Sequence, residues 1–468
     1  MKNHLHHLLL LFLLFAQCSS DDNATEKNGN NGLTQPRIMS SSPADQSVVD
    51  YCATKSVSIT FNAAIQIISS SDIKLNDTAV SAVSAENETL TISLGTLKAN
   101  TDYTLSIAAL AIKVKAGAVN SETLYIDFST SKETTQEINI STKLAMSKPT
   151  AEASALYQYL YDNYGENCIS SSMANVNWNI NEALWVEHHT GKRPVIATFD
   201  YVHLYASPAN WIDYTNTSIP EEWASNGGII SAGWHWNVPK NKAAYESGDV
   251  NQLAFYTEGN EFSVSRALTD GTWENEVLQA DLKKMGDMLQ LLKEKNIALL
   301  WRPLHEAAGN IYEFSGGTAW FWWGAEGGTA YVQLWQYVFN YFQERELNNL
   351  IWVWTTQMND EEFYPGDDYV DIIGRDIYNN TDLNDIASQF NDIQNTYYSK
   401  MVALSECGNV ADMAKQWEAG ARWSYFMPWY DYERTNNTSS SEFSLTSHEF
   451  ANIGWWKKSE ASNHIIMK

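Results

Sequence analysis

Residues 298–310 read ALLWRPLHEAAGN, an apolar run that ends in a short group of polar and charged side chains. The apolar part is typical of a buried β-strand, and Glu306 stands where such a strand would reach solvent. A single glutamate in that position is most often a solvated surface residue. Its meaning depends on whether other parts of the chain repeat the same arrangement.

The same kind of apolar run recurs along the C-terminal part of the chain. Helix-like segments, such as residues 151–164 and 275–296, separate most of the runs. The runs are CISSSM near 168, RPVIATFDY at 193, GIISAGWHWN at 228, ALLWRPLHE at 298, LIWVWTTQ at 350, VDIIGRDIYN at 370, MVALSEC at 401 and WSYFMPWYD at 423. Alternating strands and helices over this length predict a (β/α)8 barrel. A doubly wound open sheet is the alternative, but no glycine-rich phosphate loop follows the first strand.

Polar and aromatic residues gather at the C-terminal ends of these predicted strands, where barrel enzymes place their active sites. They are Trp234, His235, Trp236 and Asn237 on strand three, His305 and Glu306 on strand four, Asp376 and Tyr378 on strand six, Glu406 on strand seven, and Trp429 and Asp431 on strand eight. A random distribution would spread such residues over both ends. The pattern therefore indicates a functional rim.

Side-chain alternation predicts that two glutamates point into the barrel. The predicted inward residues are Arg302, Leu304 and Glu306 on strand four, and Val402, Leu404 and Glu406 on strand seven. His305 would face away from the interior unless the strand ends or bulges there.

Paired carboxylates across a barrel mouth are the groups that hydrolyse glycosidic bonds. One carboxylic acid protonates the leaving oxygen, while the other carboxylate attacks the anomeric carbon or activates water. A zinc site is excluded at His305 because the H-E-x-x-H motif needs a second histidine where Gly309 stands, and needs a helix. No G-x-S-x-G nucleophile motif is present. The sequence thus predicts neither a metal nor another cofactor.

The composition is that of an acidic, aromatic-rich protein. The 468 residues include 19 Trp and 24 Tyr, and the formal net charge of -26 argues against nucleic acids and anionic lipid surfaces as partners. Neutral sugar polymers fit better, because their apolar ring faces can lie on indole, although most of these rings are expected to pack in the core. Apart from Cys18, the cysteines are Cys52, Cys168 and Cys407, which form no disulfide framework and leave one bridge open.

The N-terminal residues MKNHLHHLLLLFLLFAQC predict an export signal, because the apolar run is too short to span a bilayer. The segment resembles a bacterial lipoprotein signal, with residues 1–17 removed and Cys18 lipidated. Asp21 and Asp22 resemble the surface-export tag of Bacteroidetes lipoproteins. We therefore expect a flexible tether over residues 18–35 and an exported protein, lipid-anchored to the outer membrane at the cell surface.

Residues 36–131 predict a small all-β domain. Short segments of period-two alternation, such as SVSITF and DYTLSIAA, are separated by turn signals, as in a β-sandwich. Their order is similar to that of bacterial Ig-like domains that hold enzymes away from the cell surface. We expect a spacer, with sugar binding as the alternative, followed by a linker over 132–148 and the catalytic domain over 149–468.

The combined motifs WRPLHEAAG, WFWWG and LSECGN resemble glycoside hydrolase family 26 over roughly residues 145–468. Most members are β-mannanases, which retain anomeric configuration and fold as (β/α)8 barrels. The resemblance implies that Glu306 is the acid/base and Glu406 the nucleophile. It implies substrate-site roles for His235, His305, Trp320, Asp376, Tyr378 and Trp429.

In this family the two histidines lie near the cleaved bond, and the tryptophan that opens WFWWG stacks on a neighbouring sugar. The tyrosine of RDIYNN hydrogen-bonds the nucleophile, with Asp376 beside it in the pattern. The strand-eight tryptophan, Trp429, lies under the sugar that is cleaved. Trp322 and Trp323 are expected to be packing residues.

The chain departs from the family after the histidine and glutamate. Ala307 and Ala308 replace a polar pair, and nine residues, NIYEFSGGT, precede Ala319. A Gly-Gly pair in this segment should make the loop mobile, and we expect the loop to reshape the leaving-group side of the cleft.

The expected activity is that of a monomeric, retaining endo-β-1,4-mannanase on mannan, glucomannan or galactomannan, with carboxyl groups about 5 Å apart. The alternatives are a relative that acts on β-1,3-xylan or mixed-linkage β-glucan, and a non-catalytic glycan-binding surface lipoprotein.

Overall fold

The chain divides into two compact units, Met1–Thr134 and Thr135–Lys468. The computed structural model describes residues 35–468 except 50, 52, 53, 81, 96, 116, 132–137, 314, 315, 433, 435 and 436. The predicted signal, Cys18, nearly all of the tether and Cys52 lie outside the described residues. Cys168 and Cys407 are buried free thiols. Among the described helices, none combines the length and apolar character needed to cross a bilayer.

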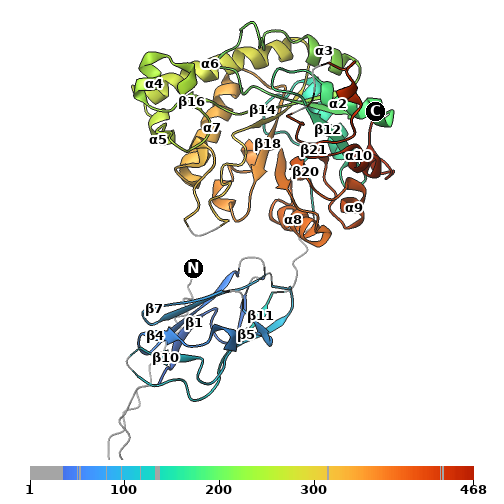
Figure 1. Cartoon of the computed structure of the whole chain (residues 1–468). Helices are drawn as coiled ribbons and strands as arrows, with labels where there is room; N and C mark the ends of the chain where they lie inside the picture. Colours follow the sequence, from blue (N-terminus) through green and yellow to red (C-terminus); the bar gives the residue numbers. More distant parts are fainter. Residues whose placement is uncertain are drawn as a thin grey trace, which may run out of the picture. The chain divides into compact units, whose positions relative to one another are not determined.

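The first unit is an all-β sandwich, as predicted (Figure 1). One sheet has the order β1-β3-β8-β7 and the other β2-β11-β9-β5-β6. The strands are β1 Ile38–Ser42, β2 Ser47–Val49, β3 Ser56–Phe61, β4 Ile65–Ile67, β5 Ile73–Leu75, β6 Thr78–Ala79, β7 Ala82–Glu86, β8 Thr89–Ser93, β9 Asp102–Ile107, β10 Ile112–Val114 and β11 Leu124–Thr130. Alternate residues such as Val57 and Ile59 are buried between the sheets, which explains the period-two pattern.

The second unit is a closed barrel of eight parallel strands, counted over the described residues. Closure follows because β12 pairs with both β13 and β21, which excludes the open doubly wound sheet. The barrel strands are β12 Cys168–Met173, β13 Ile196–Asp200, β14 Ile229–Trp234, β17 Leu299–Pro303, β18 Leu350–Thr356, β19 Ile372–Tyr378, β20 Met401–Gly408 and β21 Tyr425–Pro428. A short strand, β22 Ile465–Ile466, pairs with the start of β12. The predicted (β/α)8 barrel is confirmed.

Helices follow most of the strands and cover the outside of the barrel (Figure 1). The main helices are α1 Ala151–Asn163, α2 Asn181–Thr190, α3 Ser218–Ser225, α6 Trp273–Glu294, α7 Gly328–Glu344, α8 Leu383–Thr396, α9 Met413–Glu418 and α10 Ile453–Ser459, with short α4 Lys242–Ser247 and α5 Val264–Ala267 between β14 and α6. Several begin at side-chain caps. Thr150 accepts the amide of Ala153 at the start of α1, and Thr272 accepts that of Asn275 at the start of α6.

Apolar side chains fill the lower barrel interior and pack onto α1. The cluster includes Ile169, Ile196, Leu300, Ile351, Val353, Ile372, Met401, Ala403 and Tyr425. This layer contains Met401 and Ala403 instead of Val402 and Leu404, so the predicted phase of strand seven was wrong. Val402 and Leu404 pack outward in a different cluster, with residues of α8 and α9. Leu304 also packs outward, because β17 ends at Pro303 and Leu304 adopts a left-handed φ of 50°.

A β-bulge in β20 restores the inward direction of Glu406. Arg375 of β19 pairs with Leu404, but the next residue, Asp376, pairs with Glu406. Ser405 is therefore an extra residue in β20, and it reverses the alternation at the point where the active-site rim begins. Glu406 points inward as predicted, although not for the predicted reason.

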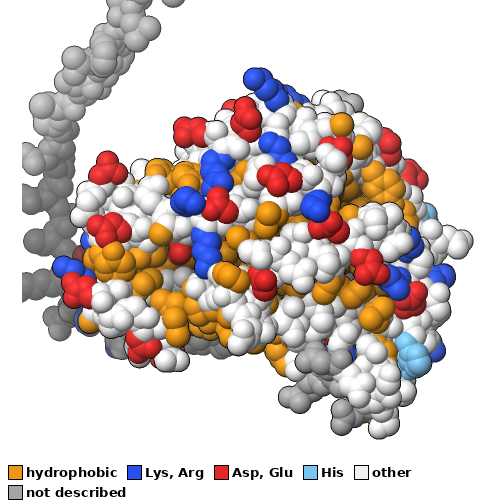
Figure 2. Space-filling model, turned by 90° about the horizontal axis from the view of Figure 1, so that it is seen from above, with side chains coloured by type: hydrophobic (Ala, Val, Ile, Leu, Met, Phe, Trp, Pro, Cys, Tyr) orange, Lys and Arg blue, Asp and Glu red, His pale blue; other side chains and the backbone are white. Residues whose placement is uncertain are grey.

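Figure 2 shows one face of the molecule, on which Lys and Arg side chains lie among Asp and Glu side chains. Within the described part of this face, no extended basic patch of the kind that binds phosphate backbones is present.

Candidate active site

A cavity of about 330 Å³ opens at the C-terminal ends of the barrel strands. Six residues predicted from the sequence line it: His235, Glu306, Trp320, Tyr378, Glu406 and Trp429. Four further lining residues were not predicted: Tyr256, Phe321, Tyr432 and Phe450. Phe321 belongs to WFWWG, and the other three come from loops whose sequences carry no periodic signal.

Arg302 lies beneath the cavity and holds the two carboxylates of β19 and β20 in place. Its Nη1 donates to Oε2 of Glu406 at 2.9 Å, its Nη2 donates to Oδ2 of Asp376, and its Nε donates to the Thr355 hydroxyl at 2.9 Å. The side chain is almost fully buried, so these partners are needed to offset the loss of hydration. The predicted inward position of Arg302 could have identified it, because a buried arginine in a strand requires acidic partners.

The second oxygen of Glu406 is bound as well. The Tyr378 hydroxyl donates to Glu406 Oε1 at 2.6 Å, which is the contact that the family resemblance implied. Asp376 accepts from the Ser405 hydroxyl at 2.7 Å and does not line the cavity. Glu406 is therefore held at both oxygens, with its orientation set before any ligand arrives.

The two glutamates lie in different electrostatic surroundings. Burial, followed by the charges of Asp376 and Glu406, raises the pKa of Glu306 well above its usual range. Burial also raises the pKa of Glu406, but the Arg302 cation and the hydrogen bond from Tyr378 act against this rise. These surroundings favour a proton on Glu306 and the ionised form of Glu406.

Glu306 occupies an irregular backbone segment after the strand. It adopts a left-handed φ of 50°, and its carbonyl accepts the amide of Gly309 at 2.9 Å. A Cβ on Gly309 would come within 2.3 Å of the Trp320 ring, so only glycine lets Trp320 pack over this turn. Non-glycine residues with such backbone angles are rare and concentrate at functional sites.

Ala307 and Ala308 are buried in the apolar cluster that surrounds the barrel. They line no part of the cavity. Gly324 packs so tightly against Ala307 that a Cβ there would lie 1.7 Å from the Ala307 carbonyl oxygen. The alanines therefore serve packing between this turn and the WFWWG segment.

His235 lines the cavity and contacts two buried residues behind it, Asp200 and His305. The Asp200 carboxylate contacts His235 twice, through the His235 backbone amide and through the His235 ring atom Nδ1. On the other side of the ring, His235 Nε2 lies 3.2 Å from His305 Nε2. Burial acts to lower the pKa of His235, but the charge and hydrogen bond of Asp200 outweigh it and the pKa is raised. Burial, Arg302 and His235 hold the pKa of His305 well below its usual range. β17 has already ended at Pro303, and His305 contacts His235 but does not itself line the cavity.

Asp200 was not among the predicted site residues. It ends the run IATFD at the same rim as the other strand-end residues, and that position is the signal that could have identified it.

Exposed aromatic rings border the carboxylates. Trp320, Tyr256 and Tyr432 are 37%, 55% and 57% exposed, and the Trp429 Nε1 donates to the Tyr432 hydroxyl at 2.9 Å. Such rings offer flat apolar faces beside hydrogen-bonding groups, which suits a sugar chain. By contrast, Trp322 and Trp323 are fully buried, as expected for packing residues, and neither lines the cavity.

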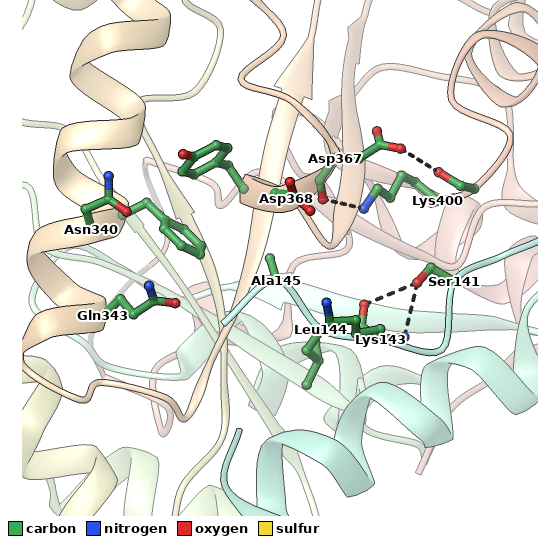
Figure 3. Close-up of a pocket in the computed structure, with 12 residues that line it drawn as sticks. Ser141, Lys143, Leu144, Ala145, Asn340, Gln343, Asp367, Asp368 and Lys400 are labelled. Atoms are coloured by element: carbon green, nitrogen blue, oxygen red, sulfur yellow. Dashed lines mark hydrogen bonds between the residues drawn. The ribbon is translucent and has the colours of Figure 1, made fainter. Parts of the chain in front are cut away.

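A larger cavity, of about 490 Å³, lies at the N-terminal end of the barrel between α7 and the segments that precede β19 and β20 (Figure 3). Its carboxylates, Asp367 and Asp368, are adjacent in the chain, and Lys400 is used to bind the carbonyls of Asp367 and Val370. It contains none of the predicted site residues. The chemistry therefore belongs to the smaller cavity, where two carboxylates of different pKa meet.

Comparison with known proteins identifies related chains for both units. The family model "Glycosyl hydrolase family 26" matches residues 145–452, and "Bacterial Ig-like domain" matches residues 33–130.

Two curated relatives are fungal enzymes. A mannan endo-1,4-β-mannosidase of Thermothelomyces thermophilus is 33% identical over 298 residues, 61% of this chain and 57% of that protein. Mannan endo-1,4-β-mannosidase B of Piromyces sp is 31% identical over 312 residues, 64% of this chain and 50% of that protein. The chain thus spans about half the length of these relatives.

Two solved structures are similar over the barrel. The GH26 domain of an endo-β-mannanase/endo-β-glucanase from Prevotella bryantii is 38% identical with a TM-score of 0.63, covering 70% of this chain and 98% of that one. A β-mannanase from a symbiotic protist of the termite Reticulitermes speratus, solved with a gluco-manno-oligosaccharide, is 32% identical with a TM-score of 0.57, covering 71% and 98%.

Proposed function

Because the chain belongs to glycosyl hydrolase family 26, we propose that it is a retaining endo-β-1,4-mannanase that cleaves mannan, glucomannan or galactomannan. The observation that carries this proposal is the unequal carboxylate pair in the cavity. Glu306 has a pKa well above its usual range, while Arg302 and Tyr378 favour the ionised form of Glu406. The mannanase relatives and the exposed rings around the pair support the choice of substrate.

In the first step, a carboxylate oxygen of Glu406 attacks the anomeric carbon of a mannose unit. The bond from that carbon to the glycosidic oxygen breaks, and Glu306 gives its proton to the departing oxygen. This step leaves a covalent mannosyl ester on Glu406 and an ionised Glu306. The Tyr378 hydroxyl and the Arg302 guanidinium orient Glu406 for the attack.

In the second step, the ionised Glu306 removes a proton from water as the water oxygen attacks the anomeric carbon. The ester bond to Glu406 breaks, and the carboxylate and the protonated Glu306 are regenerated. Two inversions at one carbon give net retention. Asp200 raises the pKa of His235 and so favours its protonated form, which adds positive charge near Glu406.

The activity is tested with the parent chain on linear mannan, galactomannan, glucomannan, β-1,3-xylan and mixed-linkage β-glucan. We expect manno-oligosaccharides from the mannans, with the β anomer formed first in proton NMR spectra. Products from xylan or glucan alone would assign the chain to those substrates. Binding to a glycan without hydrolysis of any would favour a non-catalytic role, and an α anomer as first product would exclude the retaining mechanism.

We also propose that Cys18 carries the lipid anchor at the outer membrane surface and that the Ig-like domain is a spacer. The support is the signal-like apolar run and the Asp21–Asp22 pair after Cys18. Metabolic labelling with a fatty acid should mark the parent chain and leave Cys18→Ala unlabelled. Protease digestion of intact cells should remove a surface-exposed catalytic domain, whereas full protection would contradict the surface location.

A further inference from the structure

A buried carboxylate on the outer helix α2 binds two separate parts of one cleft loop. Glu182 accepts Nε of Arg434 on Oε1 at 2.9 Å and meets Nε2 of His448 through Oε2 at 2.9 Å. Both partners belong to the loop of residues 429–452, which follows β21. We call Glu182, Arg434 and His448 the α2 clasp.

The α2 clasp lies almost entirely out of water. The side chains of Glu182, Arg434 and His448 are 6%, 6% and 2% exposed. The Arg434 guanidinium also lies over the Trp185 ring, 3.9 Å from its centre. Buried charges are costly to desolvate, so such a group is better explained by the geometry it enforces than by stability alone.

The first part of the loop carries two cavity residues, Trp429 and Tyr432. Arg434 is joined to this part by its backbone amide, which donates to the Asp431 carbonyl at 3.0 Å, and by Nη2, which lies 3.5 Å from the Asp431 carboxylate. Tyr432 in turn accepts the Nε1 hydrogen of Trp429. The position of Arg434 therefore helps to fix the positions of the Trp429 and Tyr432 rings.

The returning part of the loop carries the third cavity residue, Phe450. His448 Nδ1 accepts the backbone amides of Phe450 and Ala451, each at 2.9 Å, so the ring hydrogen is on Nε2 and is donated to Glu182. The Phe450 ring lies edge-on to Tyr378 at 5.7 Å, and Tyr378 donates to Glu406. One carboxylate outside the barrel thus holds both parts of the loop.

We propose that Glu182 is a positioning residue for substrate binding. Through Arg434 it places Trp429 and Tyr432, and through His448 it places Phe450, so that the three rings form one wall of the cavity. This inference rests on the proposed mannanase function. Rings that hold the sugar equally in the ground state and the transition state affect KM more than kcat.

The test compares Glu182→Gln with Asp371→Asn in the full-length chain. Asp371 is also a buried carboxylate with two acceptor contacts, from the amides of Ala145 and Trp352, but it precedes β19 at the opposite end of the barrel. Both variants are expected to lower Tm. On mannohexaose, Glu182→Gln should raise KM about tenfold with kcat changed less than about twofold, whereas Asp371→Asn should keep the parental KM.

Hydrogen exchange provides a readout that does not need activity. Glu182→Gln should lose protection at residues 429–432 and 448–451, and Asp371→Asn should not. A folded Glu182→Gln variant with parental KM and parental exchange would overturn the proposal. If the parent chain hydrolyses no mannan, the proposed function fails, and the exchange data still decide whether the clasp positions the loop.

Should Glu182→Gln fail to fold, Glu182→Leu combined with Arg434→Met removes both charges and leaves neither ion buried alone. The double variant should show the same rise in KM and the same loss of protection. Parental values for both would overturn the proposal.

Discussion

Asp376 of β19 lies opposite Glu406 of β20 because Ser405 is an extra residue in the second strand. The bulge directs Glu406 into the barrel, where the guanidinium of Arg302 reaches both carboxylates at once. Ser405 also contributes a contact of its own, because its hydroxyl donates to the Asp376 carboxylate. The bulge therefore sets the orientation of the proposed nucleophile. It also directs the Glu406 carboxylate toward the interior, where its charge helps to raise the pKa of Glu306.

The two glutamates should respond differently to the leaving group. Glu406→Gln should abolish turnover of all substrates, whereas Glu306→Gln should lower kcat on mannan by roughly 10²- to 10⁴-fold, the usual contribution of a general acid. An aryl mannobioside with a dinitrophenol leaving group needs no protonation, so Glu306→Gln should still release dinitrophenol in a rapid first turnover. Stopped-flow absorbance measures this burst of dinitrophenol. The control is Glu344→Gln, a change at an exposed glutamate on α7. A burst from Glu406→Gln instead would reverse the assigned roles.

Removal of the Tyr378 hydroxyl should shift the acid limb of the pH profile. The hydrogen bond from Tyr378 favours the ionised form of Glu406, so Tyr378→Phe raises the pKa of Glu406 further and moves the acid limb of kcat/KM to higher pH. The lost bond to a charged group should also cost roughly tenfold in kcat/KM at the optimum. The alkaline limb, which reports Glu306, should move less. An acid limb that stays in place or moves to lower pH contradicts the assignment.

Replacement of Asp200 should affect catalysis through His235. Asp200→Asn removes the charge that raises the pKa of His235, so this pKa should fall and the histidine should lose its proton near neutral pH. We expect kcat/KM to fall roughly 10- to 100-fold while the fold is retained. Asp213→Asn, which is exposed in the segment that follows β13, is the control. Equal effects of both changes would show that the loss of a carboxylate in this part of the chain, and not the loss of the His235 contact, is responsible.

The raised pKa of Glu306 should make the active site a source of instability at neutral pH. The folded chain holds the Glu306 proton above the usual value of 4.5, so this group lowers stability as pH rises from there toward its folded pKa. Glu306→Gln removes the penalty and should raise Tm by about 2 °C at pH 7. Calorimetry at pH 7 and near pH 4 provides the check, because the gain should vanish at the lower pH. A gain that is constant with pH would have another cause.

Local patterns in the chain were sufficient to predict the fold and to single out the proposed catalytic pair. Runs such as LIWVWTT are apolar throughout because a barrel strand is buried on both faces. The segments of the first unit alternate because a sandwich strand is buried on one face only. Glu306 and Glu406 could be named from their positions at strand ends. Each of these inferences uses residues that are neighbours in the chain.

Contacts between distant segments decided the rest of the site. The phase of β20 depends on its register with β19, which no pattern within MVALSEC reveals. The partnership of Asp200 with His235 joins two strands, and Tyr256, Tyr432 and Phe450 meet only because separate loops close over one rim. Side-chain alternation is a local property of a strand, whereas register, bulges and loop contacts arise from packing between strands, and so they became visible only in the folded barrel.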